Sequence, residues 1–167
     1  MIGWFAREGA RALLERRRPE RLAVPIPVAI AHRLQTADSG LPSDLVLSAL
    51  ARAHYCELLA PKVPHGDSEL FLVGLLSLMD AILDLPMGVV LDGINLDHDT
   101  KAVLLGQKGP LDPVYQLMIA HEAADWPKIS ALCSKLRLPE ELAVESHWKA
   151  MHWAHATTSE VAGAAHA

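Results

Sequence analysis

The sequence predicts an all-α protein, a single-domain multi-helix bundle without a sheet. Apolar residues recur at helical spacings in nearly every segment, and most of these segments begin at a capping residue or a proline. The only β-branched run, residues 24–30, contains Pro25 and Pro27, which remove two of the backbone donors that a strand needs. A chain of 167 residues is long enough for one ordinary domain, here with about seven to nine helices.

The first forty residues are expected to form helices. One helix should span residues 3–18 and end before Pro19, and a second should follow Pro27 and reach about Thr36. Residues 1–21 contain six Arg and three Glu. We expect these cations to be solvated near the C-terminal end of the first helix, where they suit the macrodipole, and an acidic lipid surface is the alternative partner.

Two helices are expected in the middle of the chain. Ser43 can cap a helix that runs to Ala60 and ends before Pro61. The next helix, residues 68–84 after the cap Asp67, is apolar almost all round and should therefore be central. The side chains expected to be largely buried in it are those of Leu72, Leu75, Leu76, Met79 and Leu83. A stripe of small and polar residues, where another backbone can approach closely, is formed by Gly74, Ser77, Ala81 and Asp84.

The second half of the chain continues with helices that begin at aspartate or proline. The expected elements are a short helix capped by Asp97 or Asp99 and ending at Gly106, a helix opened by Asp112 and Pro113, a helix over 126–137 capped by Asp125, and a last helix from Pro139 to about Thr157. Residues 157–167 are expected to form a disordered tail.

Charge and cysteine usage exclude several classes of protein. The net charge is −5 and residues 1–21 carry +3, so the remainder carries −8 and is a poor partner for nucleic acid. No run approaches the about 18 apolar residues of a transmembrane helix, and the N-terminal charges are in the wrong order for a secretory signal. Cys56 and Cys133 lack metal-ligand spacing and are expected to be buried thiols in a reducing cytoplasm, with a disulfide as the alternative.

Three stretches, residues 49–60, 69–96 and 101–138, resemble the C-terminal part of HDOD domains, as found after EAL domains in bacterial cyclic di-GMP signalling proteins. The resemblance implies an all-α bundle of HD ancestry without metal ligands, because Ser77 and Leu78 stand where an HD helix has its His-Asp pair. It divides the chain into divergent N-terminal helices (1–40), an HDOD-like domain (41–156) and the tail (157–167). No EAL or GGDEF signature is present.

Several side chains of the sequence could hold a metal ion. His98 and Asp99 are the only literal His-Asp pair, but they lie at a predicted helix start, where capping is the expected role. On the last helix a single face is expected to carry Val144, His147, Trp148, Met151, His152 and His155. The weak metal candidates are His121, His152 and His155, without a carboxylate or an HExxH motif to complete the set. His121 and Glu122 are expected to be solvated at a helix end.

We expect a non-catalytic bacterial signal-transduction module of HDOD type that binds a protein partner, with no catalytic residue, metal or cofactor and with a possible homodimer. The alternatives are an HD-type metal-dependent phosphohydrolase with atypical ligands and a membrane-surface adaptor that uses the Arg-rich N-terminal helix. The residues expected to bind a partner are Trp4, Phe5, Trp148, Met151 and Trp153.

Overall fold

The computed structural model describes residues 43–66 and 69–164, and within these ranges every regular element is a helix. The elements are α3 (Ser43–Leu59), the 3-10 helix η1 (Ala60–Lys62), α4 (Leu70–Leu76), α5 (Met79–Leu83), α6 (Met87–Asp92), α7 (His98–Leu104), α8 (Asp112–Glu122), α9 (Trp126–Leu136) and α10 (Glu140–Ala164). The all-α prediction is confirmed. The predicted helices before Ser43, with Trp4 and Phe5, lie outside the described residues. No helix in these ranges is long and apolar enough to cross a membrane.

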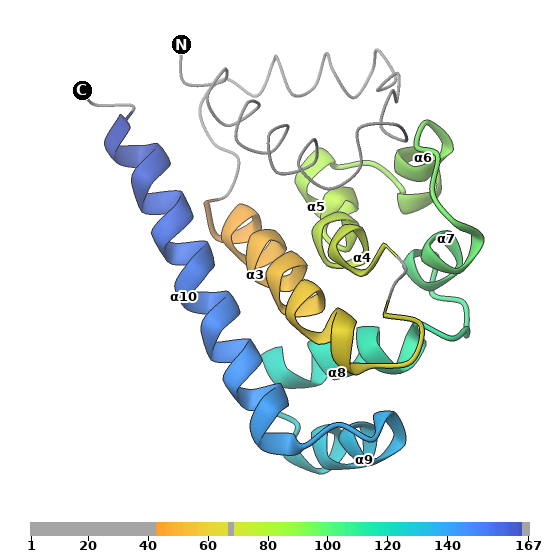
Figure 1. The fold of residues 1–167 in the computed structure, drawn as a ribbon. Helices are drawn as coiled ribbons and strands as arrows, with labels where there is room; N and C mark the ends of the chain where they lie inside the picture. Colours follow the sequence, from red (N-terminus) through yellow and green to blue (C-terminus); the bar gives the residue numbers. More distant parts are fainter. Residues whose placement is uncertain (1–42, 67–68, 165–167) are drawn as a thin grey trace.

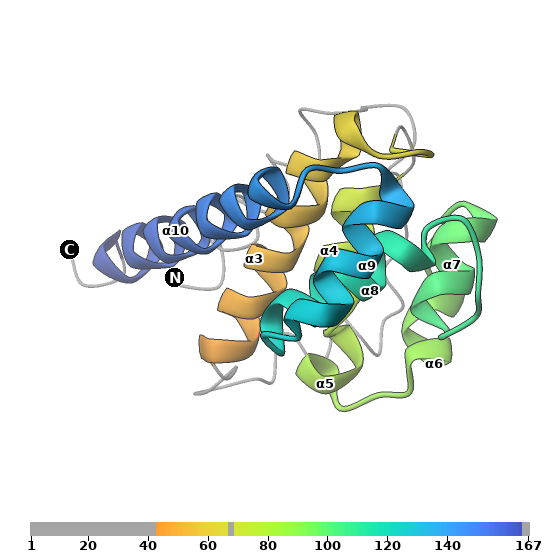
Figure 2. The ribbon, with the colours of Figure 1, turned by 90° about the horizontal axis from the view of Figure 1, so that it is seen from below.

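Helix α3 is the centre of the bundle and lies between α4 and α10 (Figure 1). Helix α9 packs against α8, while α5, α6 and α7 lie on the side of α4 that faces away from α10 (Figure 2). The main buried cluster draws on α3, α4, α7, α8, α9 and α10. Cys56 and Cys133 are both free and buried within it, as expected.

The contact between α3 and α4 depends on Gly74. A Cβ atom at this position would lie 2.4 Å from the carbonyl oxygen of Arg52 and 2.5 Å from the backbone nitrogen of Ala53. Gly74 and Ser77 are buried, whereas Ala81 and Asp84 are exposed. The predicted close approach of another backbone is therefore correct for the first half of the small stripe only.

The prediction of one continuous helix over residues 68–84 is wrong. Helix α4 ends at Leu76, and α5 begins at Met79 after a turn at Ser77 and Leu78. The Ser77 hydroxyl donates to the carbonyl oxygen of Gly74 at 2.7 Å, a bond from a serine to the preceding turn that competes with the helical pattern. Because of the break, Leu76 and Leu83 are buried as expected, but Leu72, Leu75 and Met79 are only partly buried.

The predicted helix ends are confirmed in part. The Asp125 carboxylate accepts from the backbone N–H of Lys128, and Gly106 takes a φ of +74° just after α7. Asp97 stands at the N-cap position of α7 without a side-chain cap bond. For α8, Leu111 and not Asp112 is the N-cap residue. The last helix continues past the predicted end near Thr157 to Ala164.

Helix α10 packs on α3 through small side chains rather than through its large ones. Its buried residues with described side chains are Ala143, Ser146, Ala150 and Ala154. Ala49 and Ala53 are buried on α3. Small side chains let two helix backbones approach closely. The prediction that the large residues of this helix share one face is wrong. Trp148, His152 and His155 are exposed, whereas His147 and Met151 are partly buried.

Candidate functional site

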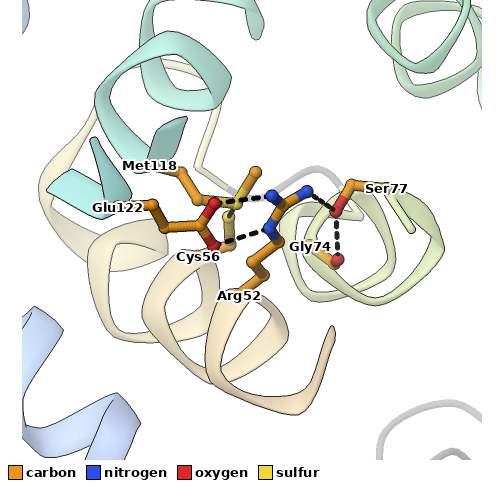
Figure 3. Close-up of polar contacts among 6 residues, drawn as sticks. All are labelled: Arg52, Cys56, Gly74, Ser77, Met118 and Glu122. Carbon is orange, nitrogen blue, oxygen red and sulfur yellow. Dashed lines mark hydrogen bonds and ion pairs between the residues drawn. The ribbon is translucent and has the colours of Figure 1, made fainter. Parts of the chain in front are cut away.

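A polar cluster joins α3, α8 and the turn after α4. Figure 3 shows the Arg52 guanidinium between Glu122 and Ser77. Its Nε donates to Oε1 of Glu122 at 2.7 Å and its Nη2 donates to Oε2 at 2.5 Å, which forms a bidentate ion pair. Its Nη1 donates to the Ser77 hydroxyl at 3.0 Å. One guanidinium thus links three segments that are far apart in the sequence.

The Ser77 hydroxyl makes two hydrogen bonds within this cluster. It accepts from Arg52 and donates to the carbonyl oxygen of Gly74. A guanidinium cannot lose its proton in a protein, so the positive charge of Arg52 is permanent. Ser77 is also the residue that stands in the place of the HD histidine according to the resemblance. The position of Ser77 therefore lies next to the permanent positive charge of Arg52.

A cavity of about 360 Å³ lies beside the Arg52–Glu122 pair, between α3, α8 and α10. It is lined by Ser48, Ala51, Arg52, Tyr55, Met118, His121, Glu122, His147 and Met151. The rings of His121 and His147 are stacked, with centroids 5.1 Å apart and an interplanar angle of 16°. Tyr55 meets both rings edge-on, at centroid distances of 5.5 Å and 5.7 Å.

Burial keeps the aromatic wall of this cavity uncharged at neutral pH. It lowers the pKa of His121 to about 4, with a further contribution from the neighbouring His147. Burial also lowers the pKa of His147, against the opposing effect of Glu122. The pKa of the Tyr55 phenol is raised, again mainly by burial. Both imidazoles and the phenol are thus neutral at pH 7.

Two polar atoms in this wall have no hydrogen-bond partner. They are the hydroxyl of Tyr55 and Nε2 of His121, both buried. Tyr55 is only 1% exposed and His121 only 8% exposed. The expectation that His121 is solvated is therefore wrong, and its neighbour Glu122 is held by Arg52. In the described ranges, Thr100 on α7 has the other buried side-chain oxygen without a partner.

The low pKa of His121 leads to a prediction about stability. Its folded-state pKa of about 4 lies below its ordinary value of 6.5, so the unfolded chain takes up the proton first as the pH falls. The contribution of the neutral His121 ring to the free energy of unfolding is fully present above about pH 6.5. It is lost as the pH falls from there to about pH 4. We expect this change to be on the order of 2 kcal/mol in the free energy of unfolding.

Urea unfolding at pH 7 and pH 5 measures this effect. His121→Gln removes the titrating group, so the variant should lose less stability between the two pH values than the wild-type protein. His152→Gln changes an exposed imidazole on α10 and serves as the matched control. Equal pH dependence in all three proteins would contradict the assigned burial of His121.

The three weak metal candidates are not brought together. His121 lies in the cavity wall on α8, whereas His152 and His155 are exposed on α10. His152 stacks on Trp148, with ring centroids 5.6 Å apart. In the described parts of the chain, no group of three or more His, Cys, Asp or Glu side chains could hold a metal ion. His98 is exposed and lies 3.5 Å from the carboxylate of Asp99.

The partner-binding candidates on α10 have different surroundings. Trp148 is 63% exposed. Trp153 is partly buried and stacks on His54 of α3, with ring centroids 4.6 Å apart. Met151 lines the cavity. Of these three residues, Trp148 alone is free to present a large apolar surface to a partner.

Sequence reasoning did not find Arg52, Tyr55 or Glu122 as site residues. Arg52 is flanked by Ala51 and Ala53 in an otherwise apolar part of α3, and a cation in such a position signals a paired charge. Its partner Glu122 is 70 residues away, so no local spacing identifies the pair.

The chain is similar to two curated proteins. It is 28% identical over 137 residues to the cyclic di-GMP phosphodiesterase CdgJ of Vibrio cholerae, an alignment that covers 80% of this chain and 31% of CdgJ. It is 27% identical over 113 residues to the uncharacterized protein YuxH of Bacillus subtilis, covering 67% of this chain and 27% of YuxH. The chain thus spans less than a third of either relative. No protein-family model matches it, and no solved structure matches it.

Proposed function

We propose that this chain is a non-catalytic signalling module of HDOD type that acts by binding another protein. The similarity to CdgJ, a cyclic di-GMP phosphodiesterase, supports a role in cyclic di-GMP signalling. Because the chain corresponds to less than a third of CdgJ, the proposal rests on the residues of this chain and not on the named activity of that protein. The all-α bundle agrees with the fold that the HDOD resemblance implies.

The observation that carries the non-catalytic part is the contact between Arg52 and Ser77. An HD-type hydrolase needs a cation that polarises water, held by neutral imidazoles and carboxylates. Here the Ser77 hydroxyl accepts from a guanidinium, and the nearby carboxylate of Glu122 is taken up by the same guanidinium. A divalent cation at this place would meet a fixed positive charge, and the side-chain oxygens of Ser77 and Glu122 already accept hydrogen bonds from that charge. These residues do not fit a metal ion.

The first test is a search for turnover. The protein should not hydrolyse cyclic di-GMP or a phosphomonoester above a buffer control, with or without added Mg²⁺ or Mn²⁺. Product formation measured by chromatography decides the matter. Metal-stimulated turnover that is lost in His98→Ala or Asp99→Asn would contradict the proposal.

We further expect the protein-binding surface to include Trp148. A large apolar side chain that is 63% exposed on the longest helix of the described structure suits an interface. A symmetric dimer is the simplest occupant, because a second copy of the same surface is always available.

Light scattering at micromolar concentration tests the dimer. The wild-type chain should give about twice the monomer mass, and Trp148→Glu should give the monomer. Trp126→Glu is the matched control, since Trp126 is 59% exposed on α9. A strict monomer, or equal effects of the two substitutions, would contradict a dimer interface at Trp148.

A further inference from the structure

Helices α5 and α6 share a small apolar cluster that is only partly covered by the rest of the described structure. Two of its side chains are buried, those of Leu83 and Val90. Val89, the neighbour of Val90 on α6, is 51% exposed. The side chains packed around the two buried ones are only partly buried: Met79, Ile82, Leu85, Met87 and Ile94. Covering such a cluster with another apolar element removes this surface from water and is favourable.

The surface around this cluster is acidic. Residues 79–99 contain five Asp and no Lys or Arg. Asp84, at the end of α5, and Asp92, at the end of α6, are exposed. This part of the chain lies on the side of α4 that faces away from α10 and Trp148 (Figure 2). Exposed apolar side chains beside carboxylates suit an occupant that is both basic and apolar.

Residues 1–21 of the same chain have the complementary composition. They contain six Arg and three Glu, a net charge of +3, and five large apolar side chains, Ile2, Trp4, Phe5, Leu13 and Leu14. The 21 residues from 22 to 42 connect them to Ser43, the first residue of α3, which packs on α4. A connection of this length can span up to about 70 Å, more than the about 30 Å of a small domain.

We propose that residues 1–21 bind, within the same chain, to the α5–α6 face, which is defined by Asp84, Val89 and Asp92. Arginines of the segment lie beside the two carboxylates, and its apolar side chains cover Val89 and the adjoining cluster. Covalent connection gives the segment an effective concentration in about the millimolar range, so a weak attraction is sufficient. Docked in this way, these arginines are not available to an acidic lipid surface. The proposal requires neither a dimer nor the absence of catalysis.

Paramagnetic broadening in the full chain measures this contact. Cys56 and Cys133 are free but buried, so a nitroxide reagent attaches selectively to the thiol introduced by Ala10→Cys. The ¹³C-labelled methyl groups of the methionines are the reporters, and the same sample with a reduced label is the reference.

The methionines divide into two groups for this experiment. The signals of Met79 and Met87, on α5 and α6, should be strongly broadened. Those of Met118 and Met151, on α8 and α10, should be broadened much less. Ionic strength should reduce the difference between the groups, because salt screens the attraction between exposed charges.

Two variants with the same change in net charge test the acidic part of the face. Asp84→Asn combined with Asp92→Lys should reduce the broadening of Met79 and Met87 to the level of Met118. Asparagine is chosen because residue 84 has a φ of +52°, which this side chain tolerates. Glu141→Gln combined with Glu145→Lys changes exposed carboxylates on α10 and is the matched control. The control should keep the broadening of the parent protein.

Val89→Ser tests the apolar part without changing the charge. It should also reduce the broadening of Met79 and Met87, and the change should persist at high salt, where the electrostatic part is screened. Since Val89 is half-exposed, the variant should unfold at nearly the same urea concentration as the parent protein.

Mixing two samples identifies the chain that supplies the segment. Spin-labelled chains without ¹³C are combined with ¹³C-labelled chains without a spin label, and no broadening should appear. Broadening in this mixture would show that a second copy is the occupant and would overturn the proposal. Equal broadening of all four methionine signals, or equal effects of the two charge variants, would overturn it as well. None of these results bears on turnover or on Trp148, so this proposal and the proposed function fail separately.

Discussion

Gly74→Ala should lower the free energy of unfolding by about 3 kcal/mol or more, at the upper end of the usual cost of overpacking. The added Cβ would lie 2.4 Å from the carbonyl oxygen of Arg52 and 2.5 Å from the carbonyl carbon of the same residue. Both are backbone atoms of α3, which cannot move aside as a flexible side chain does. The helices α3 and α4 would have to separate, and the contact between Arg52 and Ser77 would be stretched with them.

Gly88→Ala is the matched control for this substitution. Gly88 also lies within a helix, α6, but a Cβ at this position would meet no atom within 4 Å. Alanine is favoured over glycine inside a helix by about 0.5–1 kcal/mol, so this variant should be as stable as the wild-type protein or slightly more stable. Urea unfolding compares the two variants. Equal stabilities would show that α3 and α4 do not meet at Gly74.

Arg52→Met should cost about 2–3 kcal/mol of stability. Methionine keeps much of the apolar stem but leaves Glu122 without its partner and Ser77 without its donor. Breaking a fully buried pair in this way costs about 3–5 kcal/mol. The lower value is expected here because the side chain of Glu122 is 33% exposed, against 12% for Arg52, and can turn toward water.

A double-mutant cycle with Glu122→Gln measures the coupling directly. The double variant should be more stable than the sum of the two single effects predicts, by about 1–2 kcal/mol. Lys149→Met is the control, since Lys149 forms an exposed pair with Glu145 at 2.8 Å. Such surface pairs contribute about 0.3–0.5 kcal/mol. If Arg52→Met were as mild as Lys149→Met, the cluster would not hold the three segments together.

The elements that depend on local spacing could be predicted from the sequence. The helical period identified α3 and α9, and the Asp125 cap and the Gly106 helix end follow from the chemistry of neighbouring residues. The break at Ser77 could not be predicted in this way. It involves a hydroxyl whose other bond comes from Arg52, 25 residues earlier in the chain.

The orientation of α10 shows a second limit. The sequence predicted one face with Val144, His147, Trp148, Met151, His152 and His155, and it did not identify the stripe that packs on α3. The structure instead places Ala150 and Ala154 against the bundle, where small side chains permit a close approach of two helices. Which stripe of α10 packs on α3 depends on the surface of α3. The alanines of α3 do not by themselves identify the surface that α10 covers.

The cavity was also beyond the reach of sequence reasoning. Tyr55, His121 and His147 come from three helices, and their meeting depends on how α3, α8 and α10 cross. The sequence did single out His121 and the imidazoles of the last helix as unusual. The structure stacks His121 on His147 and leaves His152 and His155 exposed, so the three weak metal candidates do not meet and His121 belongs to a neutral aromatic wall.

The metal content of the purified full chain tests the central claim most directly, because an HD-type site requires a bound cation and the Arg52 cluster has no place for one. Elemental analysis for Mn, Fe and Zn after dialysis should find far less than one ion per chain. Addition of Mn²⁺ should not raise the thermal midpoint. A stoichiometric metal ion that survives dialysis, and whose removal lowers the thermal midpoint, would contradict the account.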